Sequence, residues 1–469
     1  MKSSSVLLLG ALVAAPAIGQ VPPPRIAARH PAPRTSAPPQ MSYLDNGTIR
    51  VGVDLDMGGA ITYLSRSSDS VNVINSFDLG REVNPSFYSG PSPYGHPSPD
   101  WPNWPWNPVG AGDTYGNRSQ VVSSANDGST LFVRAIPMQW ALDNVACECF
   151  VETRITLDGN AVRLRYRLTN HRTDLRDFGG YGQELPAVYT VGKLWRLFTY
   201  DGASPFTGDS VREVPFVAGP PWQALVPTEN WVALVDDSKW GVGVVNTDVF
   251  FFLGGFAGTP DAGGPGDNNT GYIAPVREEM LDHNIAYTYE ASLVLGTVAD
   301  IRAYAVAHRR ADSRPDYHFD LDRFQEDRRG FTYLNAMDEG LPIRGSLHVK
   351  LDEVDPQIYP PEGHWDASEM PVLYIRAAFH THDATGAVFW SGPGQDIDGS
   401  RVVLFPTIPD GQFHTYAVDL AASPDYTGTI AHLRFDPGDG GVADDWVEIA
   451  WISFQPDAAP RRPRVVERH

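Results

Sequence analysis

The feature that most constrains this chain is an alternation of apolar and polar side chains with a period of two, which recurs over much of its length. Residues 49–55 and 61–63 alternate on either side of Gly58-Gly59, and residues 153–157 and 162–168 flank a second turn. Successive side chains of a strand point to opposite faces, and Gly-rich turns join antiparallel neighbours. These segments therefore predict β-hairpins and an all-β fold.

Composition agrees with an all-β fold of more than one domain. The chain has 469 residues, with 44 Gly and 40 Pro to form turns, and it carries 12 Trp, 19 Tyr and 21 Phe. A chain of this length forms two or three domains. Many turns together with many aromatic residues are typical of sandwiches and barrels rather than of helix bundles. Helical periodicity is confined to one short segment, residues 299–307.

The formal net charge of −21 excludes some partners. A chain with so large a negative charge cannot neutralise many phosphate groups, which argues against nucleic acid or an anionic membrane surface as its partner.

Beyond the N-terminus no stretch is long and apolar enough to span a bilayer, so no membrane span is expected. The sequence also lacks a phosphate loop, a nucleophile elbow and a His-Glu-x-x-His helix, and we expect no cofactor.

The two ends of the chain differ in composition from the rest. The apolar run of residues 6–15 after a charged start is typical of an export signal, which we place at residues 1–19. An uncleaved membrane anchor is the alternative. Residues 20–40 form a Pro-rich linker that can bury little apolar surface, and residues 457–469 form a basic tail. We therefore expect a secreted or periplasmic protein.

The chain has two cysteines, Cys147 and Cys149. On a strand, side chains two residues apart face the same way but sit too far apart for an easy disulfide. Two thiols without further ligands do not make a metal site. We expect two small half-buried residues, and a fold that depends on its cores rather than on disulfides.

Residues 315–456 carry a second series of strands separated by turns. Their motifs include Tyr317-His-Phe-Asp-Leu-Asp, Gly345-Ser-Leu-His-Val, Phe413-His-Thr-Tyr-Ala-Val-Asp-Leu and Val447-Glu-Ile-Ala-Trp-Ile. This unit resembles the jelly-roll modules, related to carbohydrate-binding modules, of secreted polysaccharide-degrading proteins. The resemblance implies a C-terminal β-jelly-roll sandwich, with the usual acidic residue of the last strand at Glu448.

Residues 41–308 resemble the galactose-mutarotase-like supersandwich, which aldose epimerases share with domains of glycoside hydrolases and polysaccharide lyases. The resemblance lies in Val53-Asp-Leu-Asp-Met-Gly-Gly-Ala-Ile-Thr-Tyr-Leu, Asp78-Leu-Gly-Arg81 and Leu168-Thr-Asn-His171. It implies an N-terminal β-supersandwich that holds the active site. Epimerases carry a second catalytic His shortly after the Thr-Asn-His strand, whereas this chain has Gly179-Gly-Tyr-Gly-Gln-Glu-Leu-Pro there. Epimerase activity is therefore not expected.

Three tryptophans lie within six residues in Trp101-Pro-Asn-Trp104-Pro-Trp106. Proline stiffens such a loop, so its rings lose little entropy on binding, and the CH faces of sugars stack on aromatic rings. We predict that Trp101, Trp104 and Trp106 bind carbohydrate, with Tyr115 as a further binding group. The alternative is that the indoles cap the edge of the core.

A second group of binding candidates precedes this loop. The guanidinium of Arg81 can hold a carboxylate or a pair of hydroxyls in one plane, and Tyr88 can stack on a ring or donate a proton. The alternative for Arg81 is an internal pair with Asp78 that fixes the loop.

The candidate catalytic residues are Glu184, Asp78, Asp113 and His171. Glycoside hydrolysis needs one carboxyl group to protonate the leaving oxygen and a second to attack or to activate water. Glu184, on an expected loop after a Gly-rich bend, is the first choice, and Asp78 and Asp113 compete for the second place. His171 could act as an acid or base near neutral pH, or be a hydrogen-bonded structural residue.

Two further patterns keep alternatives open. Arg163, Arg165 and Arg167 share one strand face, which is either solvated or a strip for acidic polysaccharide; the second case would favour a lyase. The acidic turns 396–399 and 436–440 each offer too few oxygens to hold calcium alone, so plain turns are favoured over a structural calcium site, and no catalytic metal is expected.

Together these observations predict a secreted glycan-active enzyme, a glycoside hydrolase that uses paired carboxylates on a poly- or oligosaccharide. One alternative is a non-catalytic carbohydrate-binding or surface protein. The other is a polysaccharide lyase that acts on uronate-containing glycans.

Overall fold

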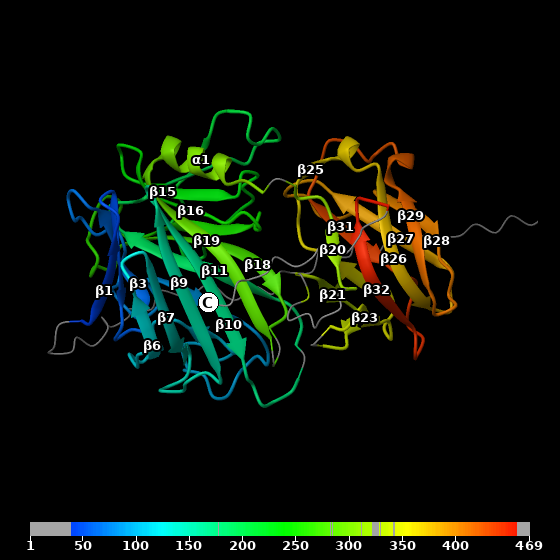
Figure 1. The fold of residues 1–469 in the computed structure, drawn as a ribbon, viewed down its shortest axis with the longest axis horizontal. Helices are drawn as coiled ribbons and strands as arrows, with labels where there is room; N and C mark the ends of the chain where they lie inside the picture. Colours follow the sequence, from blue (N-terminus) through cyan, green and yellow to red (C-terminus); the bar gives the residue numbers. More distant parts are fainter. Residues whose placement is uncertain are drawn as a thin grey trace, which may run out of the picture.

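The computed structural model describes residues 39–456, apart from residues 177, 282, 284, 311, 321–327, 329, 341 and 342. The predicted export signal, the basic tail and nearly all of the Pro-rich linker lie outside the described residues. Figure 1 shows two lobes side by side, both made of β-sheet. The predicted all-β fold class is confirmed.

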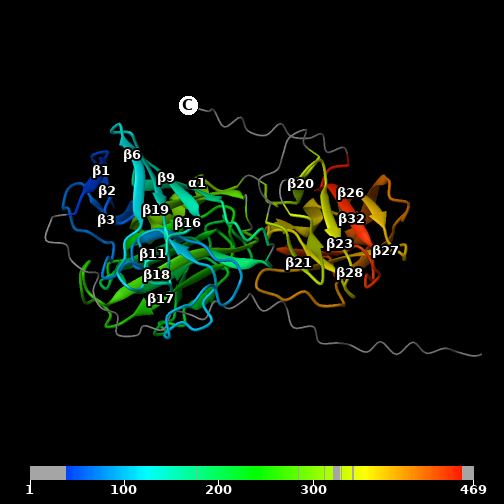
Figure 2. The ribbon, with the colours of Figure 1, turned by 90° about the horizontal axis from the view of Figure 1, so that it is seen from below.

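The first lobe is a sandwich of two large antiparallel sheets, seen as two layers in Figure 2. The ten-stranded sheet runs in the order β1 (Met41–Asp45), β2 (Ile49–Asp54), β3 (Ala60–Arg66), β4 (Val83–Ser86), β11 (Tyr181–Val191), β18 (Thr270–Glu279), β17 (Phe252–Ala257) and β14 (Gln223–Leu225). In addition, β5 (Pro108–Val109) pairs with β4, and β8 (Met138–Gln139) pairs with β5.

The nine-stranded sheet runs in the order β13 (Arg212–Val214), β12 (Arg196–Thr199), β15 (Trp231–Val235), β16 (Trp240–Val245), β19 (Ala286–Thr297), β10 (Ala161–Asn170), β9 (Cys149–Asp158), β7 (Thr130–Ile136) and β6 (Gln120–Asn126). Helix α1 (Val298–Ala307) follows β19 and packs on the outer face of this sheet. The helical segment predicted at residues 299–307 is therefore confirmed.

The alternation in the sequence determines which side chains form the core between these sheets. In β10, Val162, Leu164 and Leu168 are fully or almost fully buried against the other sheet, while Arg163 and Arg167 between them are exposed. The two predicted hairpins are confirmed, because β2 pairs with β3 and β9 pairs with β10. Burial of such side chains stabilises the fold by about 25 cal/mol for each Å² of apolar surface removed from water.

The expectation that the cysteines stay unpaired is wrong, because Cys147 and Cys149 form a disulfide. Strand β9 begins only at Cys149, and Cys147 lies in the preceding bend. The bend brings the two Cα atoms to 5.1 Å, within the range that a disulfide bridges and closer than two positions of an extended strand allow.

The second lobe is a smaller sandwich with its own hydrophobic core. Its six-stranded sheet contains β22 (Met337–Asp338), β23 (Leu347–Lys350), β32 (Trp446–Ser453), β26 (Val372–His380) and β29 (Phe413–Asp419), with β20 (Asp316–His318) beside β32. The five-stranded sheet contains β21 (Thr332–Leu334), β24 (Gln357–Tyr359), β31 (His432–Asp436), β27 (Thr385–Ser391) and β28 (Val402–Pro406). A short ribbon joins β25 (Trp365–Asp366) to β30 (Thr429–Ile430), and 3₁₀ turns span Ala367–Glu369 and Leu420–Ala422.

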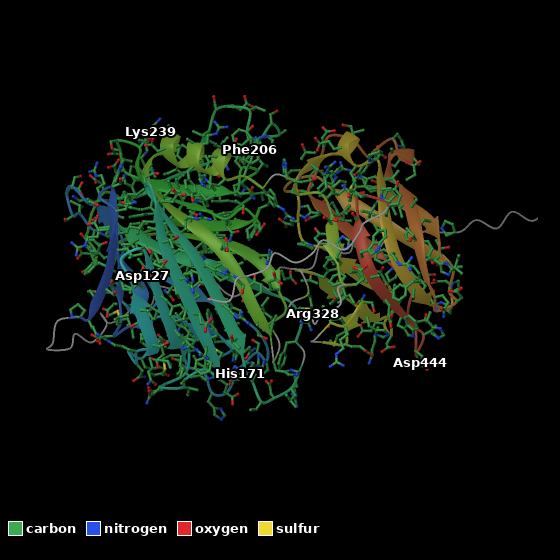
Figure 3. All side chains as sticks on the ribbon, in the orientation of Figure 1. Asp127, His171, Phe206, Lys239, Arg328 and Asp444 are labelled. Atoms are coloured by element: carbon green, nitrogen blue, oxygen red, sulfur yellow. A yellow bond between two sulfur atoms is a disulfide. The ribbon has the colours of Figure 1, made fainter. Side chains whose placement is uncertain are left out.

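The two lobes contact each other through buried polar and aromatic side chains. Arg328 lies between them (Figure 3), where its guanidinium donates to the backbone oxygen of Met280 at 3.3 Å and pairs with Asp338. Phe250 of the first lobe stacks on His364 of the second, with ring centres 5.8 Å apart. Within the part of the chain described here, no helix is long and apolar enough to cross a membrane.

Candidate functional site

A small polar cavity lies on the outer face of the ten-stranded sheet, where β4 and β11 pair. Its volume is about 40 Å³, and its lining includes Asn84, Ser86, Tyr88, Trp104, Trp140 and Glu184. Glu184 stands opposite Ser86 in the register, and Ala187 stands opposite Asn84. A bulge between Glu184 and Ala187 inserts a residue, so both side chains reach the same face although they are three positions apart.

Glu184 is the only carboxylate among the described residues that line this cavity. It lies within β11 rather than on the loop that the sequence suggested, and its side chain keeps partial access to solvent. The phenol of Tyr88 donates to Oε2 at 3.3 Å, and the phenol of Tyr272, from the neighbouring strand β18, donates to Oε1. Two phenols, one just after β4 and one on β18, therefore hold one carboxylate between them.

A chain of hydrogen bonds leads to Glu184 from the Trp-rich loop. An indole N–H can only donate, so the bond from Trp104 Nε1 to Asn107 Oδ1 at 2.9 Å fixes the orientation of that amide. The amide nitrogen of Asn107 then donates to Ser86 Oγ at 3.2 Å, and Ser86 donates to the Tyr88 hydroxyl at 3.2 Å. With that oxygen already accepting, the Tyr88 proton points to Glu184.

The backbone of Tyr88 is held separately. Gln183, which is fully buried, accepts from the N–H of Tyr88 at 2.7 Å and donates to its carbonyl oxygen at 2.8 Å. The same amide nitrogen donates to the backbone oxygens of Tyr181 and Glu279. Both the main chain and the hydroxyl of Tyr88 are thus fixed before any ligand binds.

Burial dominates the proton affinities at this site. It raises the pKa of Glu184 above its ordinary value, while the hydrogen bonds from Tyr272 and Tyr88 lower it in part. The pKa values of Tyr88 and Tyr272 lie well above the usual value for tyrosine, first because of burial and then because of the nearby Glu184 charge. Both phenols are therefore neutral donors at neutral pH, and Glu184 keeps its proton to higher pH than an ordinary glutamate does.

The three predicted sugar-stacking tryptophans are all buried, with exposed fractions of 7%, 3% and 0% for Trp101, Trp104 and Trp106. The prediction that these three indoles form a sugar-stacking surface is therefore wrong, and the alternative, indoles that cap the edge of the core, agrees with their burial. The loop folds back on itself, because the backbone N–H of Tyr94 donates to the backbone oxygen of Trp104 and the backbone N–H of Ser89 donates to that of Trp106. Burial of a large indole lowers the free energy of the folded chain more than its exposure to water does. Trp104 nevertheless contributes to the cavity wall and to the hydrogen-bond chain.

Asp78 and Arg81 form an internal pair at 3.3 Å, with both side chains nearly inaccessible to solvent. Arg81 also donates to the backbone oxygen of Asn268 at 2.7 Å. This is the loop-fixing arrangement that the sequence left as the alternative to binding. Neither residue lines the cavity, although Gly80 between them does.

Asp113 and His171 also lie outside the cavity lining. Asp113 Oδ1 accepts the backbone N–H groups of Tyr115 and Asn117, and Oδ2 accepts that of Asn144, so this carboxylate ties two loops together. His171 is exposed at the lower edge of the first lobe (Figure 3), just after β10. Tyr115 is 47% exposed and remains a candidate binding group on the surface.

Sequence reasoning missed Asn84, Asn107 and Tyr272. Asn84 and Ser86 occupy alternate positions with Tyr88, which identifies a polar face on β4 once that strand is recognised. No local pattern marks Tyr272, since it reaches Glu184 only through the pairing of β11 with β18. Among the described residues, no group of three or more His, Cys, Asp or Glu side chains could hold a metal ion.

Comparison with known proteins found no matching family model and no matching curated protein. Among solved structures, the chain is similar to a galactose mutarotase-like protein from Lactobacillus casei, at 11% identity and a TM-score of 0.36, over 54% of this chain and 99% of that protein. It is also similar to the 4-alpha-glucanotransferase from Thermococcus litoralis, at 10% identity and a TM-score of 0.28, over 56% of this chain and 40% of that one. A third similar structure is the alpha-galactosidase from Lactobacillus brevis, at 8% identity and a TM-score of 0.33. The match covers 55% of this chain and 40% of that protein.

Proposed function

We propose that this chain is an exported glycan-active enzyme, with glycoside hydrolysis as the leading chemistry and Glu184 as its acid–base residue. The observation that carries the proposal is a partly buried carboxylate between two phenol donors in a polar cavity with aromatic walls. Such sites combine an apolar surface for a sugar ring with a few polar groups that fix its orientation. The acidic composition and the apolar N-terminal run agree with action on a glycan outside the cytoplasm.

The cavity departs from the paired-carboxylate arrangement in one respect. Asp78 and Asp113 are engaged elsewhere, and no second carboxylate among the described residues lines the cavity. Some glycosidases use a tyrosine in place of one carboxylate. In this chain the partner of Glu184 would be Tyr88 or Tyr272. Glu184 would take the proton of the phenol whose oxygen attacks the anomeric carbon, and would give a proton to the leaving glycosidic oxygen.

The test is the release of reducing ends from a panel of neutral and acidic polysaccharides by the wild-type protein and by Glu184→Gln. We expect product from at least one polysaccharide and a loss of roughly 10²- to 10⁴-fold in the variant, the usual contribution of a general acid–base residue. Glu290→Gln, a change at an exposed carboxylate on the opposite sheet, is the matched control and should keep full activity.

A non-catalytic carbohydrate-binding role is the second candidate, because the cavity admits only a few water-sized groups and the indoles around it are buried. Saturable glycan binding with no product, unchanged in Glu184→Gln, would favour this role over the enzyme.

A lyase on uronates would instead produce ultraviolet-absorbing unsaturated ends and would lose activity in Tyr88→Phe alone. The described lining of the cavity contains no Arg or Lys that could neutralise a uronate.

A further inference from the structure

Asn84, on β4, has a buried amide side chain whose oxygen is hydrogen-bonded and whose nitrogen is not. Its side chain is 1% exposed and lines the cavity. Its Oδ1 accepts the backbone N–H of Gly110 at 3.1 Å, whereas its Nδ2 has no partner among the residues that the structure describes. Buried N–H groups nearly always have a hydrogen-bond acceptor. We therefore expect a bound molecule to supply the acceptor for this nitrogen.

The orientation of this amide is not arbitrary. A backbone N–H only donates, so the group that faces Gly110 must be the oxygen of Asn84, and the buried nitrogen is the end of the amide that has no partner among the described residues. Asn84 and Ser86 lie two residues apart on one face of β4, opposite Ala187 and Glu184 of β11. A fixed donor and a fixed carboxylate acceptor therefore line the same small space.

A donor and an acceptor together complement a group that both accepts and donates, and in a neutral sugar the hydroxyl is such a group. A hydroxyl accepts through its oxygen and donates through its single proton, so it can satisfy Asn84 and Glu184 at the same time. A cavity of about 40 Å³ has room for a hydroxyl or hydroxymethyl group but not for a sugar ring. The ring itself would remain above the cavity.

Charge decides which sugars can provide this group. Within the described residues, the lining carries the Glu184 carboxylate and no cationic side chain. An anionic substituent placed there would face like charge in a partly buried space without compensation. A carboxylate, sulfate or phosphate at this position of the sugar would therefore be rejected.

We propose that the cavity is a hydroxyl-recognition subsite for a neutral sugar, in which Asn84 donates to the oxygen of one sugar hydroxyl and Glu184 accepts its proton. This inference rests on the proposed function and deepens it, because it assigns an uncharged glycan as the substrate class. It makes Asn84 a specificity-determining residue.

The experiment measures binding of neutral monosaccharides (glucose, galactose and mannose) and of glucuronate and galacturonate to the full chain by calorimetry and by intrinsic fluorescence, since Trp104 and Trp140 line the cavity. At least one neutral sugar should bind, and its uronate should bind at least tenfold more weakly. Asn84→Asp keeps the acceptor for Gly110 but removes the donor, and it should weaken neutral-sugar binding at least tenfold. Asn84→Ala should do the same, whereas Asn103→Ala, at an exposed asparagine, should not.

The outcomes separate the two levels of the proposal. Uronate binding equal to or tighter than neutral-sugar binding overturns the subsite, as does unchanged affinity in both Asn84 variants, while reducing-end release would still support the enzyme. Polysaccharide cleavage that depends on Glu184 but not on Asn84 also overturns the subsite alone. Absence of binding to either series, together with no product from any polysaccharide, overturns the proposed function as well.

Discussion

Tyr272→Phe tests whether the two phenols control the proton affinity of Glu184. The change removes the donor to Oε1 but keeps the ring, which stacks on Trp222 with centres 4.7 Å apart. Hydrogen bonds to a carboxylate favour its charged form. The loss of this donor should therefore raise the pKa of Glu184 further above the value that burial already sets.

The magnitude follows from the strength of a charge-assisted hydrogen bond. Such bonds contribute about 1.5–3 kcal/mol, and about 1.4 kcal/mol corresponds to a tenfold change in an equilibrium constant. Tyr272→Phe should therefore raise the proton affinity of Glu184 roughly 10- to 100-fold. Tyr88 donates at 3.3 Å, which is long for an O–H···O bond. Tyr88→Phe should have the smaller effect, less than about tenfold.

The assay is a carbon-13 NMR titration of the Glu184 carboxyl carbon, assigned by comparison with Glu184→Gln. Its midpoint should move to higher pH in Tyr272→Phe, and the pH limb of kcat/KM that requires ionised Glu184 should move in the same direction. Tyr115→Phe is the control, because that exposed ring is not part of the cavity lining and should leave the midpoint unchanged. An unmoved midpoint in Tyr272→Phe, or a larger shift in Tyr88→Phe, would refute this reasoning.

Three further predictions concern stability. Glu82 is fully buried, and its pKa is raised well above the ordinary value, first by burial and then by Asp78. Glu82 therefore keeps its proton to higher pH in the folded protein than in the unfolded chain, and its contribution to the free energy of unfolding falls as pH rises. In urea titrations, Glu82→Gln should thus increase the free energy of unfolding at about pH 8 and change it little near pH 4. Arg328→Ala should cost about 3–5 kcal/mol in the same assay, because it leaves Asp338 charged and buried; replacing both by apolar residues should cost less. Replacing Cys147 and Cys149 by Ser should cost only about 1–2 kcal/mol, because the disulfide closes a very short loop; a larger loss of stability, with reductant having no effect on the variant, would contradict this estimate.

The strands could be predicted from the sequence because their signal is local. Alternation identifies which residues of β10 face the core, and the turn between β9 and β10 sets their register. The disulfide was missed for the same reason, because a strand pattern was extended across Cys147, where the chain bends before β9 begins. What alternation cannot predict is which loops fold back. The Trp-rich loop has the composition of a binding surface but covers apolar neighbours instead.

The site was only partly predictable because its members come together through sheet pairing. Glu184 and Tyr88 could be chosen by residue type, but the partners that give them a chemical role are distant in sequence. Tyr272 is 88 residues from Glu184 and meets it only because β18 pairs with β11. Asp78 and Asp113 were equally good candidates by composition. Their hydrogen bonds and ion pairs, which exist only in the folded chain, assign them to loop structure instead.

Strand β18 connects the site around Glu184 with the second lobe. This strand carries Tyr272 near its start and Arg277 and Glu279 at its end, where Arg277 pairs with Glu279 and donates to the Tyr287 hydroxyl. The chain continues directly into Met280, whose carbonyl oxygen accepts the guanidinium of Arg328. A hydrogen-bonded site works only when its supporting groups are held to a fraction of an ångström. Because Arg328 of the second lobe binds the residue that follows the strand carrying Tyr272, we predict that the second lobe helps to hold the carboxylate site in place, whether or not it binds a glycan itself.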